Sequence, residues 1–204
     1  MDNVLLETAK RAFQIQSECL AEAFPHVGDE AFLQVVEKLA VAPRIAASGC
    51  GHSGIACQHF AHLMCCIERP ARFISPAEAV HGAMGFVQPG DVMLLASRGG
   101  TTQELMQILD ICKQKNIYVI AVTENLASPM AQGADVVLGM YINRETDKHN
   151  AQGTTSFVML SALFDALQAA LIEKLDYRNE QFAVVHPGGA VGERLNAGKK
   201  KPAT

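Results

Sequence analysis

Apolar residues along the chain follow two different periods, and the change from one period to the other predicts where helices and strands lie. Between residues 4 and 24 apolar side chains recur every three or four positions, which is typical of an amphipathic helix. Residues 29–41 repeat this spacing. Residues 44–47 form a short apolar run that follows Pro43 and leads into glycines, so they are predicted to form a buried strand.

The alternation of the two patterns continues to residue 174. Helical spacing covers residues 53–66, 101–115, 128–132 and 154–174, and strand-like apolar runs cover residues 71–74, 91–96, 117–122 and 135–140. Strands separated by helices favour parallel βαβ units, so the predicted fold class is α/β, a three-layer αβα sandwich around a parallel sheet. Ligands of such sheets bind at the carboxyl ends of the strands, and candidate residues are sought there.

The composition supports a folded domain and excludes several classes of protein. With 204 residues, 49% hydrophobic and 19% charged, the chain has the length of one domain and is too apolar to be disordered. We expect residues 1–198 to form this single domain, N-terminal helices included, and residues 199–204 to form a polar tail. The chain has no apolar run of about 18 residues, and charges occur throughout its first turns, so neither a membrane span nor a secretory signal is expected.

Charge and cysteine content favour a cytoplasmic protein with small-molecule chemistry. The net charge of −4, from 17 basic and 21 acidic residues, lacks the basic surplus of nucleic-acid-binding proteins. The six cysteines match no zinc-binding spacing, and a chain of this length needs no disulfides, so free thiols, no metal site and a cytoplasmic location are predicted. Cys65 and Cys66 lie in an apolar helical stretch, where we expect both thiols to pack in the core.

The loop after the first predicted strand is rich in glycine and serine and consists of Ser48, Gly49, Cys50, Gly51, His52, Ser53 and Gly54. It contains G-x-G-x-x-G between a strand and a helix, which is the signature of a dinucleotide-binding turn. That interpretation requires an acidic residue at the end of the next strand, where the chain has Ser75 and Pro76. A turn that binds a smaller anion fits better, and its candidate binding residues are Ser48, Gly49, Gly51, His52 and Ser53.

Two further loops at strand ends offer hydroxyl groups and helix amides, which suit a phosphate monoester. In the loop 97–102 the candidate phosphate-binding residues are Ser97, Gly99, Gly100, Thr101 and Thr102. The long predicted helix opens with three more candidates, Thr154, Thr155 and Ser156. In both loops the alternative is an ordinary helix cap, because serine and threonine are common cap residues. Three hydroxyls around two glycines favour phosphate binding in the loop 97–102.

Taken together, the three loops resemble the sugar isomerase (SIS) domain family. The loop 97–102 is similar to the family's S-x-S-G-x-T phosphate loop, with Gly99 where a serine is usual. Residues 76–82 and 182–190 are similar to segments of the arabinose-5-phosphate isomerases in that family, and the H-P-G-G-A stretch in the second segment is the most specific part. Many members of this subfamily carry two C-terminal CBS modules. The chain stops where those would begin, so a version without them is expected.

The resemblance implies a flavodoxin-like sandwich with a five-stranded parallel sheet, assembled as homodimers or homotetramers. It also implies interconversion of D-arabinose 5-phosphate and D-ribulose 5-phosphate without a metal or an organic cofactor. The family's functional positions, which are the candidate catalytic residues, fall on Glu104, Glu145, His81 and His186. The chain departs from the family at His52, where a functional lysine is usual, and at residues 147–150, which are more polar than usual. Histidine loses its charge as pH rises, so substrate binding is expected to weaken with rising pH.

Aldose–ketose isomerisation transfers a proton between C1 and C2 through an enediol, and it needs a base near both carbons. A carboxylate suits that role. Glu104 lies one turn into the helix after the loop 97–102 and Glu145 follows the last predicted strand, so both are expected at the carboxyl edge of the sheet. The alternatives are a helix-dipole acid for Glu104 and a solvated loop charge for Glu145. His81 and His186, on glycine- and proline-rich loops, are the other candidate proton carriers.

Two alternative functions stand beside this hypothesis. The chain could isomerise another sugar phosphate, such as a hexulose 6-phosphate, or it could be a non-catalytic phosphosugar-binding module. A binding module would not need Glu104 and Glu145, so their joint presence favours catalysis. The expected partners are a phosphosugar and further copies of the chain, because residues 4–24 are more apolar than one sheet requires. Sites shared between subunits are expected, since His186 lies far along the chain from the loops; nucleic acid and membranes are not expected as partners.

Overall fold

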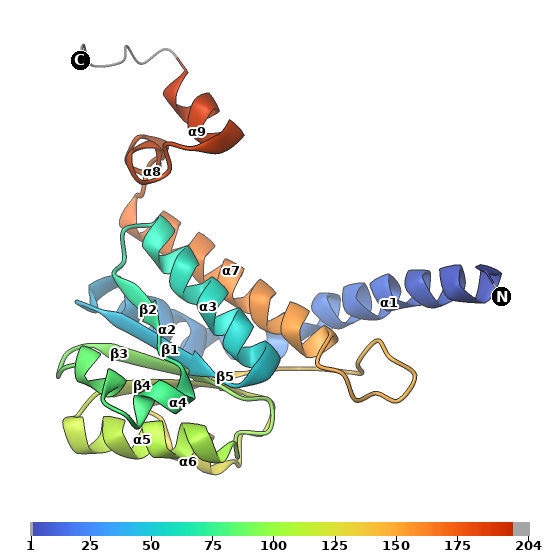
Figure 1. Ribbon diagram of the computed structural model, residues 1–204, viewed down its shortest axis with the longest axis horizontal. Helices are drawn as coiled ribbons and strands as arrows, with labels where there is room; N and C mark the ends of the chain where they lie inside the picture. The colour runs from blue at the N-terminus through green and yellow to red at the C-terminus, as the bar shows by residue number, and fades with distance from the viewer. Residues whose placement is uncertain (1, 198–204) are drawn as a thin grey trace.

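The computed structural model describes residues 2–197, which form a parallel sheet between two layers of helices (Figure 1). The strands are β1 (Ile45–Gly49), β2 (Ala71–Phe73), β3 (Val92–Ala96), β4 (Tyr118–Thr123) and β5 (Val136–Gly139). The helices are α1 (Asp2–Ala23), α2 (Asp29–Val41), α3 (Gly51–Cys66), α4 (Pro76–Ala79), α5 (Gln103–Lys115), α6 (Pro129–Gly133), α7 (Thr155–Leu175), α8 (Asn179–Val185) and α9 (Gly189–Asn196), with short 3-10 helices η1 (Phe24–His26) and η2 (Ala83–Phe86). The α/β prediction is confirmed, and the predicted elements lie within one or two residues of their observed ends.

The strand order predicts a ligand crevice at the carboxyl ends of β1 and β3. The five strands pair in the order β2-β1-β3-β4-β5, and every pairing is parallel. The chain moves outward from β1 to β2 and then returns past β1 to β3, so the order reverses between β1 and β3. In open parallel sheets the loops that leave the strands on either side of such a reversal diverge and leave a crevice. The glycine loop 48–54 and the loop 97–102 follow these two strands.

Helices cover both faces of the sheet and divide the core in two. One core joins α2, α3 and α7 to the sheet through side chains such as Leu39, Phe60 and Phe164. The other core joins α4, α5 and α6 to the opposite face through side chains such as Leu105 and Met130. The five residues of β1 and the five of β3 are all buried, as expected for central strands covered on both faces (Figure 1).

The helix α7 is, among residues 2–197, the one helix long and apolar enough to cross a membrane. Length and composition are the only support for such a span, and the core helix of a globular domain meets the same criteria. Six apolar residues of α7 are buried in the core it shares with α2 and α3: Met159, Leu160, Leu163, Phe164, Leu167 and Leu171. This packing accounts for the apolar composition of α7.

The first strand extends two residues beyond its predicted end. Ser48 and Gly49 continue the pairing with β3, and Gly49 lies opposite Ala96. A Cβ atom on Gly49 would lie 2.9 Å from the backbone carbon of Ser53, so only glycine allows α3 to begin this close to the strand. Because the turn is so tight, α3 starts at Gly51, two residues before the predicted start.

The segment after α7 contains two helices that the sequence analysis did not predict. α8 and α9 are seven and eight residues long, and proline and glycines separate them, so neither displays enough apolar periodicity to be recognised. In Figure 1 they project from the end of α7, and α1 projects from another side with the N-terminus at its far end. The expected polar tail, residues 199–204, lies outside the described residues.

All six cysteines are free thiols, as predicted. Cys19, Cys57 and Cys112 are buried, and burial raises the pKa of Cys112 to about 12. The prediction that Cys65 and Cys66 pack in the core is wrong: Cys65 is exposed and Cys66 only partly buried, because in the last turn of α3 it is Met64 that faces the core. The one thiol of α3 that reaches the core, Cys57, lies on the same face of that helix as Phe60 and Met64.

Candidate functional site

A cleft of about 410 Å³ opens at the carboxyl ends of β1 and β2, beside the reversal of strand order. Its lining residues come from the glycine loop, the start of α3, the end of β2, the start of α4 and the first turn of α5: Gly49, Cys50, Gly51, Gly54, Ile55, Gln58, Phe73, Ser75, Pro76, Ala77 and Glu104. The structure thus brings Glu104 together with the predicted glycine loop. A cleft of this size can hold a molecule as large as a pentose phosphate.

The glycine loop shapes this cleft with its backbone. Gly51 has a φ of +54° and open space around its Cα atom, so its amide and the start of α3 are accessible from the cleft. Ser48 is fully buried, and its hydroxyl donates to the carbonyl of Ile74 at 2.7 Å, which ties β1 to the end of β2. Ser53 is partly buried on the first turn of α3. Ser48 therefore organises the loop from behind, whereas Gly51 faces a ligand.

The loop 97–102 is closed by its own side chains. The hydroxyls of Ser97 and Thr102 lie 2.8 Å apart, and the Gly100 amide donates to the Ser97 hydroxyl at 3.2 Å. A Cβ atom on Gly100 would lie 2.0 Å from the hydroxyl of Ser128, and its φ is +65°, so this position requires glycine. Gly99 and Thr101 are exposed at the tip of the loop. Thr102 precedes α5, and the free amides of that helix start are directed toward the tip.

Glu145 lies in a second cluster, apart from the cleft lining. Its side chain is only 2% exposed, and its Oε1 atom accepts from Arg98 at 3.0 Å. Its Oε2 atom accepts from the Thr155 amide at 2.6 Å, the Ser156 amide at 3.2 Å and the Thr154 hydroxyl at 3.1 Å. The carboxylate therefore occupies the start of α7, which is a favourable place for a negative charge. The candidate phosphate-binding groups of Thr154, Thr155 and Ser156 are thus bonded to another candidate residue.

His52 connects the glycine loop to the start of α7. Its Nδ1 atom lies 2.6 Å from the carbonyl oxygen of Gly153. A carbonyl oxygen only accepts, so the hydrogen of this bond is on Nδ1 and the neutral ring has its lone pair on Nε2. A Cβ atom on Gly153 would lie 2.8 Å from Nδ1, so glycine permits this contact. His52 is exposed, and its ring makes an edge contact with Phe157.

Glu104 and Cys50 face the same cleft, and their environments differ from that of Glu145. Glu104 is exposed in the first turn of α5, and the ion pairs found within residues 2–197 do not include it. Burial, with a smaller effect from the charge of Glu104, raises the pKa of the Cys50 thiol. Cys50 therefore stays protonated and is a poor nucleophile. The Glu104 carboxylate is therefore accessible to a substrate and available to accept and donate a proton.

The two candidate histidines lie elsewhere. His81 is exposed after α4 and is absent from the lining of the cleft. His186 follows α8 and lines a separate cavity of about 360 Å³ with residues of α3, α7 and α8. Its Nδ1 atom is buried there and has no hydrogen-bond partner within residues 2–197. Within one subunit, neither histidine is brought to Glu104.

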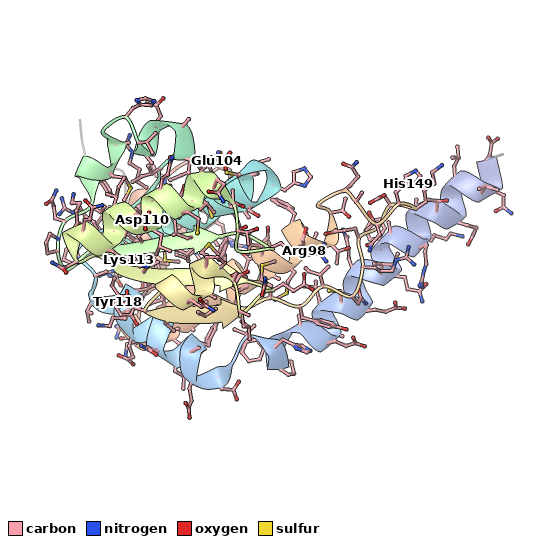
Figure 2. The ribbon with its side chains drawn as sticks, turned by 90° about the horizontal axis from the view of Figure 1, so that it is seen from below. Arg98, Glu104, Asp110, Lys113, Tyr118 and His149 are labelled. Atoms are coloured by element: carbon pink, nitrogen blue, oxygen red, sulfur yellow. The ribbon has the colours of Figure 1, made fainter. Side chains whose placement is uncertain are left out.

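Figure 2 orients these residues along the sheet. Glu104, Asp110 and Lys113 follow one another along α5, and Tyr118 lies at the same end as Lys113, away from Glu104. Arg98 lies on the side of the molecule toward α1, and His149 lies farther out beside α1. The polar segment 147–150 therefore belongs to a projecting loop. No group of three or more His, Cys, Asp and Glu side chains arranged for a metal ion occurs in residues 2–197.

Arg98 and Glu124 belong to the site region and were not among the sequence-predicted residues. The Nε atom of Arg98 donates to Glu124 at 2.7 Å, and its Nη1 atom donates to Glu145. Both residues directly follow a strand, Arg98 two positions after β3 and Glu124 one position after β4. A charged residue at such a position is a signal that could have identified both.

Comparison with known proteins identifies relatives for most of the chain. The family model described as SIS domain matches residues 38–170. The arabinose 5-phosphate isomerase KdsD of Pseudomonas aeruginosa is 34% identical over 191 residues, which cover 93% of this chain and 58% of that enzyme. The chain therefore spans little more than half the length of this curated relative.

Solved structures agree with this comparison. A crystal structure from Listeria monocytogenes, described as a candidate sugar-phosphate isomerase, has a TM-score of 0.90 and 36% identity and covers 92% of this chain and 99% of that chain. A protein of E. coli CFT073 in complex with arabinose 5-phosphate has a TM-score of 0.85 and 25% identity and covers 92% of this chain and 100% of that chain. The architecture described above is thus shared over nearly the full length of both.

Proposed function

The chain belongs to the SIS domain family, and from that premise we propose that it is an aldose–ketose isomerase that interconverts D-arabinose 5-phosphate and D-ribulose 5-phosphate. The observation that carries the proposal is the cleft at the reversal of strand order, in which Glu104 faces the glycine loop. The relatives named for arabinose 5-phosphate, and the neighbour solved in complex with it, support this choice of substrate.

The phosphate group is proposed to bind at the loop 97–102. The exposed tip of that loop, Gly99 and Thr101, and the start of α5 offer backbone amides to a dianion. The hydroxyls of Ser97 and Thr102 are paired with each other, and a phosphoryl oxygen can accept from one of them once that pair opens. Glu104 lies one turn into the same helix, so an anchored phosphate places the sugar chain along the cleft beside its carboxylate.

Glu104 is proposed to carry the proton between the two carbons. Its carboxylate removes the proton from C2 of the aldose while the carbonyl oxygen O1 is protonated, which forms the enediol. The same proton is then delivered to C1 while the O2 hydroxyl loses its proton, which forms the ketose carbonyl at C2. A carboxylate with no competing ion pair in a partly closed cleft suits both steps. Proton carriers for O1 and O2 are proposed to be His52, whose Nε2 atom accepts when the ring is neutral and donates when it is protonated, and His186, with His81 on the loop after α4 as a further candidate.

His186 can serve this site only if it comes from another subunit. It lies in the α8–α9 arm, at the end of α7 opposite to the end that meets the loop of Glu145. The arm exposes Val184, Val185 and Val191, and α1 exposes further large apolar side chains, including Leu6 and Phe13. Exposed apolar side chains on two projecting segments favour association of subunits. A homodimer or homotetramer with shared sites is therefore proposed.

The proposal also includes a cellular location and two alternative functions. The six free thiols support a cytoplasmic location. Another sugar phosphate is the alternative substrate, because His52 replaces the lysine that the family's motif carries at this position. A non-catalytic phosphosugar sensor is less well supported, because a sensor has no use for the free carboxylate of Glu104 in the cleft.

The test is turnover of arabinose 5-phosphate by the purified chain in the presence of a chelator, alongside the variant Glu104→Gln. We expect turnover in the native protein and a loss of about 100-fold or more in kcat in the variant, because a general base contributes on that order. Glu173→Gln, an exposed change near the far end of α7, is the matched control. Binding of arabinose 5-phosphate without turnover of any pentose or hexose phosphate would instead identify a sensor.

A further inference from the structure

Arg98 joins the ends of three strands at the proposed site. Its backbone carbonyl accepts from the Thr123 hydroxyl at 2.9 Å and from the Glu124 amide at 3.0 Å, which attaches the loop after β3 to the end of β4. Its guanidinium then donates to Glu124 at 2.7 Å and to Glu145, beyond the end of β5, at 3.0 Å. Both the backbone and the side chain of this residue are therefore held in place.

Glu145 depends on this contact because its carboxylate is nearly inaccessible to water. A buried charge is tolerated when it is paired and hydrogen-bonded, and the removal of one partner leaves the other charge without compensation. Arg98 is its one cationic partner within residues 2–197, while the α7 amides and Thr154 bind its other oxygen. The two oxygens thus have different partners, and the Arg98 contact determines which direction Oε1 faces.

We propose that Arg98 is a positioning residue: it fixes the Glu145 carboxylate, and with it the start of α7, relative to the loop 97–102 that is proposed to anchor the phosphate. The inference rests on the proposed function, in which His52 takes part, because His52 is hydrogen-bonded to Gly153 beside the start of α7. Arg98 is itself a member of the phosphate loop, so any movement of that loop on phosphate binding is transmitted to Glu145 through a single side chain. A lysine cannot fully reproduce this, because only the planar guanidinium can donate to Glu124 and Glu145 in a fixed fork.

The test is a double-mutant cycle on isomerase activity with Arg98→Gln, Glu145→Gln and the double variant. Arg98→Gln is expected to lower kcat by on the order of 100-fold with a much smaller change in KM, because a displaced catalytic group slows chemistry more than binding. In the Glu145→Gln background the same change is expected to have little further effect, since Arg98 acts through Glu145. Arg98→Lys should recover part of the activity. Arg178→Gln, which removes an exposed ion pair with Asp176, is the control.

A second measurement does not depend on activity. Hydrogen exchange of the Thr155 and Ser156 amides reports whether Glu145 still occupies the start of α7, and it should accelerate in Arg98→Gln but not in Arg178→Gln. If the native protein turns over no sugar phosphate, the proposed function fails while this exchange measurement still tests the positioning. Additive effects in the cycle, or unchanged exchange at both amides, would overturn the role of Arg98.

Discussion

Two candidate glutamates show how much the surroundings of a residue decide its role. Glu104 faces a cleft with its carboxylate free of the ion pairs described, whereas Glu145 is buried against Arg98 and the start of α7. The sequence placed both at the carboxyl edge of the sheet, which is correct. It could not separate them, because Arg98, the cationic partner of Glu145, lies 47 positions away in the loop after β3. Which carboxylate is free is a tertiary property.

The bond between His52 and Gly153 leads to a prediction at the same scale. Because Nδ1 donates to a carbonyl, the ring has a fixed orientation and only Nε2 remains to meet a substrate phosphate or hydroxyl. Histidine changes charge within the physiological pH range and lysine does not. We expect the affinity for arabinose 5-phosphate to fall more steeply with rising pH in the native protein than in His52→Lys. Calorimetric titration across this range is the measurement.

The exchange His59→Lys provides a control for this prediction, because His59 lies about two turns farther along α3 and pairs with Asp165 on the surface. That variant should keep the native pH dependence. The same pH dependence in His52→Lys as in the native protein would show that the charge of His52 does not contribute to binding. The approach of His52 to Gly153 was not foreseeable from the sequence, since 101 positions separate the two residues.

At the scale of elements, the helices and strands were predicted well and the loops between them were not. Apolar periodicity is a local property, so the ends of the predicted strands and helices were recovered within one or two residues, whereas the four-residue helix α4 was not predicted. The conformation of the loop between β5 and α7 depends on contacts that the pattern does not encode. Within it, Asp147 accepts from the amides of His149, Ala151 and Gln152 at 2.8–3.0 Å. This single carboxylate organises the polar segment in which the chain departs from its family.

The hydrogen bonds to Asp147 predict how this loop responds to acid. Backbone donors, chiefly the Gln152 amide, hold the pKa of Asp147 below its ordinary value. A lowered pKa in the folded state means that the contribution of Asp147 is fully present at neutral pH and is lost as pH falls through that lowered value. We expect Asp147→Ala to open the loop at neutral pH and to accelerate tryptic cleavage after Lys148 several-fold. The exposed Asp110 provides the control Asp110→Ala.

In the native protein, the same three amides should keep their protection against hydrogen exchange, relative to an open loop, as pH is lowered to about 4, near the ordinary pKa of aspartate. They should lose that protection only below this pH. Loss of protection already near pH 6 would show that another group controls the loop. Equal cleavage of Asp147→Ala and Asp110→Ala would show that the three amide bonds do not hold the segment together.

At the scale of the whole molecule, two segments project from the sheet and its helices and expose apolar side chains. α1 exposes Val4, Leu5, Leu6 and Phe13, and the α8–α9 arm holds His186 apart from the cleft that contains Glu104. The sequence predicted an apolar excess before residue 24 and a distant histidine, and both features are present in the structure. The pairing of subunits stays a proposal, because the structure describes one chain.

Mixing of two inactive variants tests that proposal. In a shared site, Glu104 of one subunit works with His186 of another, so Glu104→Gln and His186→Gln homo-oligomers are each inactive. A hybrid dimer assembled from both variants contains one intact site out of two. Random exchange makes about half of the dimers hybrids, so about a quarter of native activity is expected to return. Activity before and after subunit exchange is the measurement, with light scattering to determine assembly size. A fully active monomer, or no recovery after proven exchange, would exclude shared sites.

The carboxylate of Glu145 at the start of α7 also determines how many anions each subunit can take up. It comes from only ten positions before Thr155 and acts as a tethered internal ligand, so its effective concentration at those amides exceeds that of any small anion in solution. We therefore expect free phosphate not to compete for the α7 amides, which leaves the loop 97–102 as the proposed phosphate site. One subunit is then expected to saturate with a single phosphate, although its sequence presents two segments of nearly the same hydroxyl-rich composition.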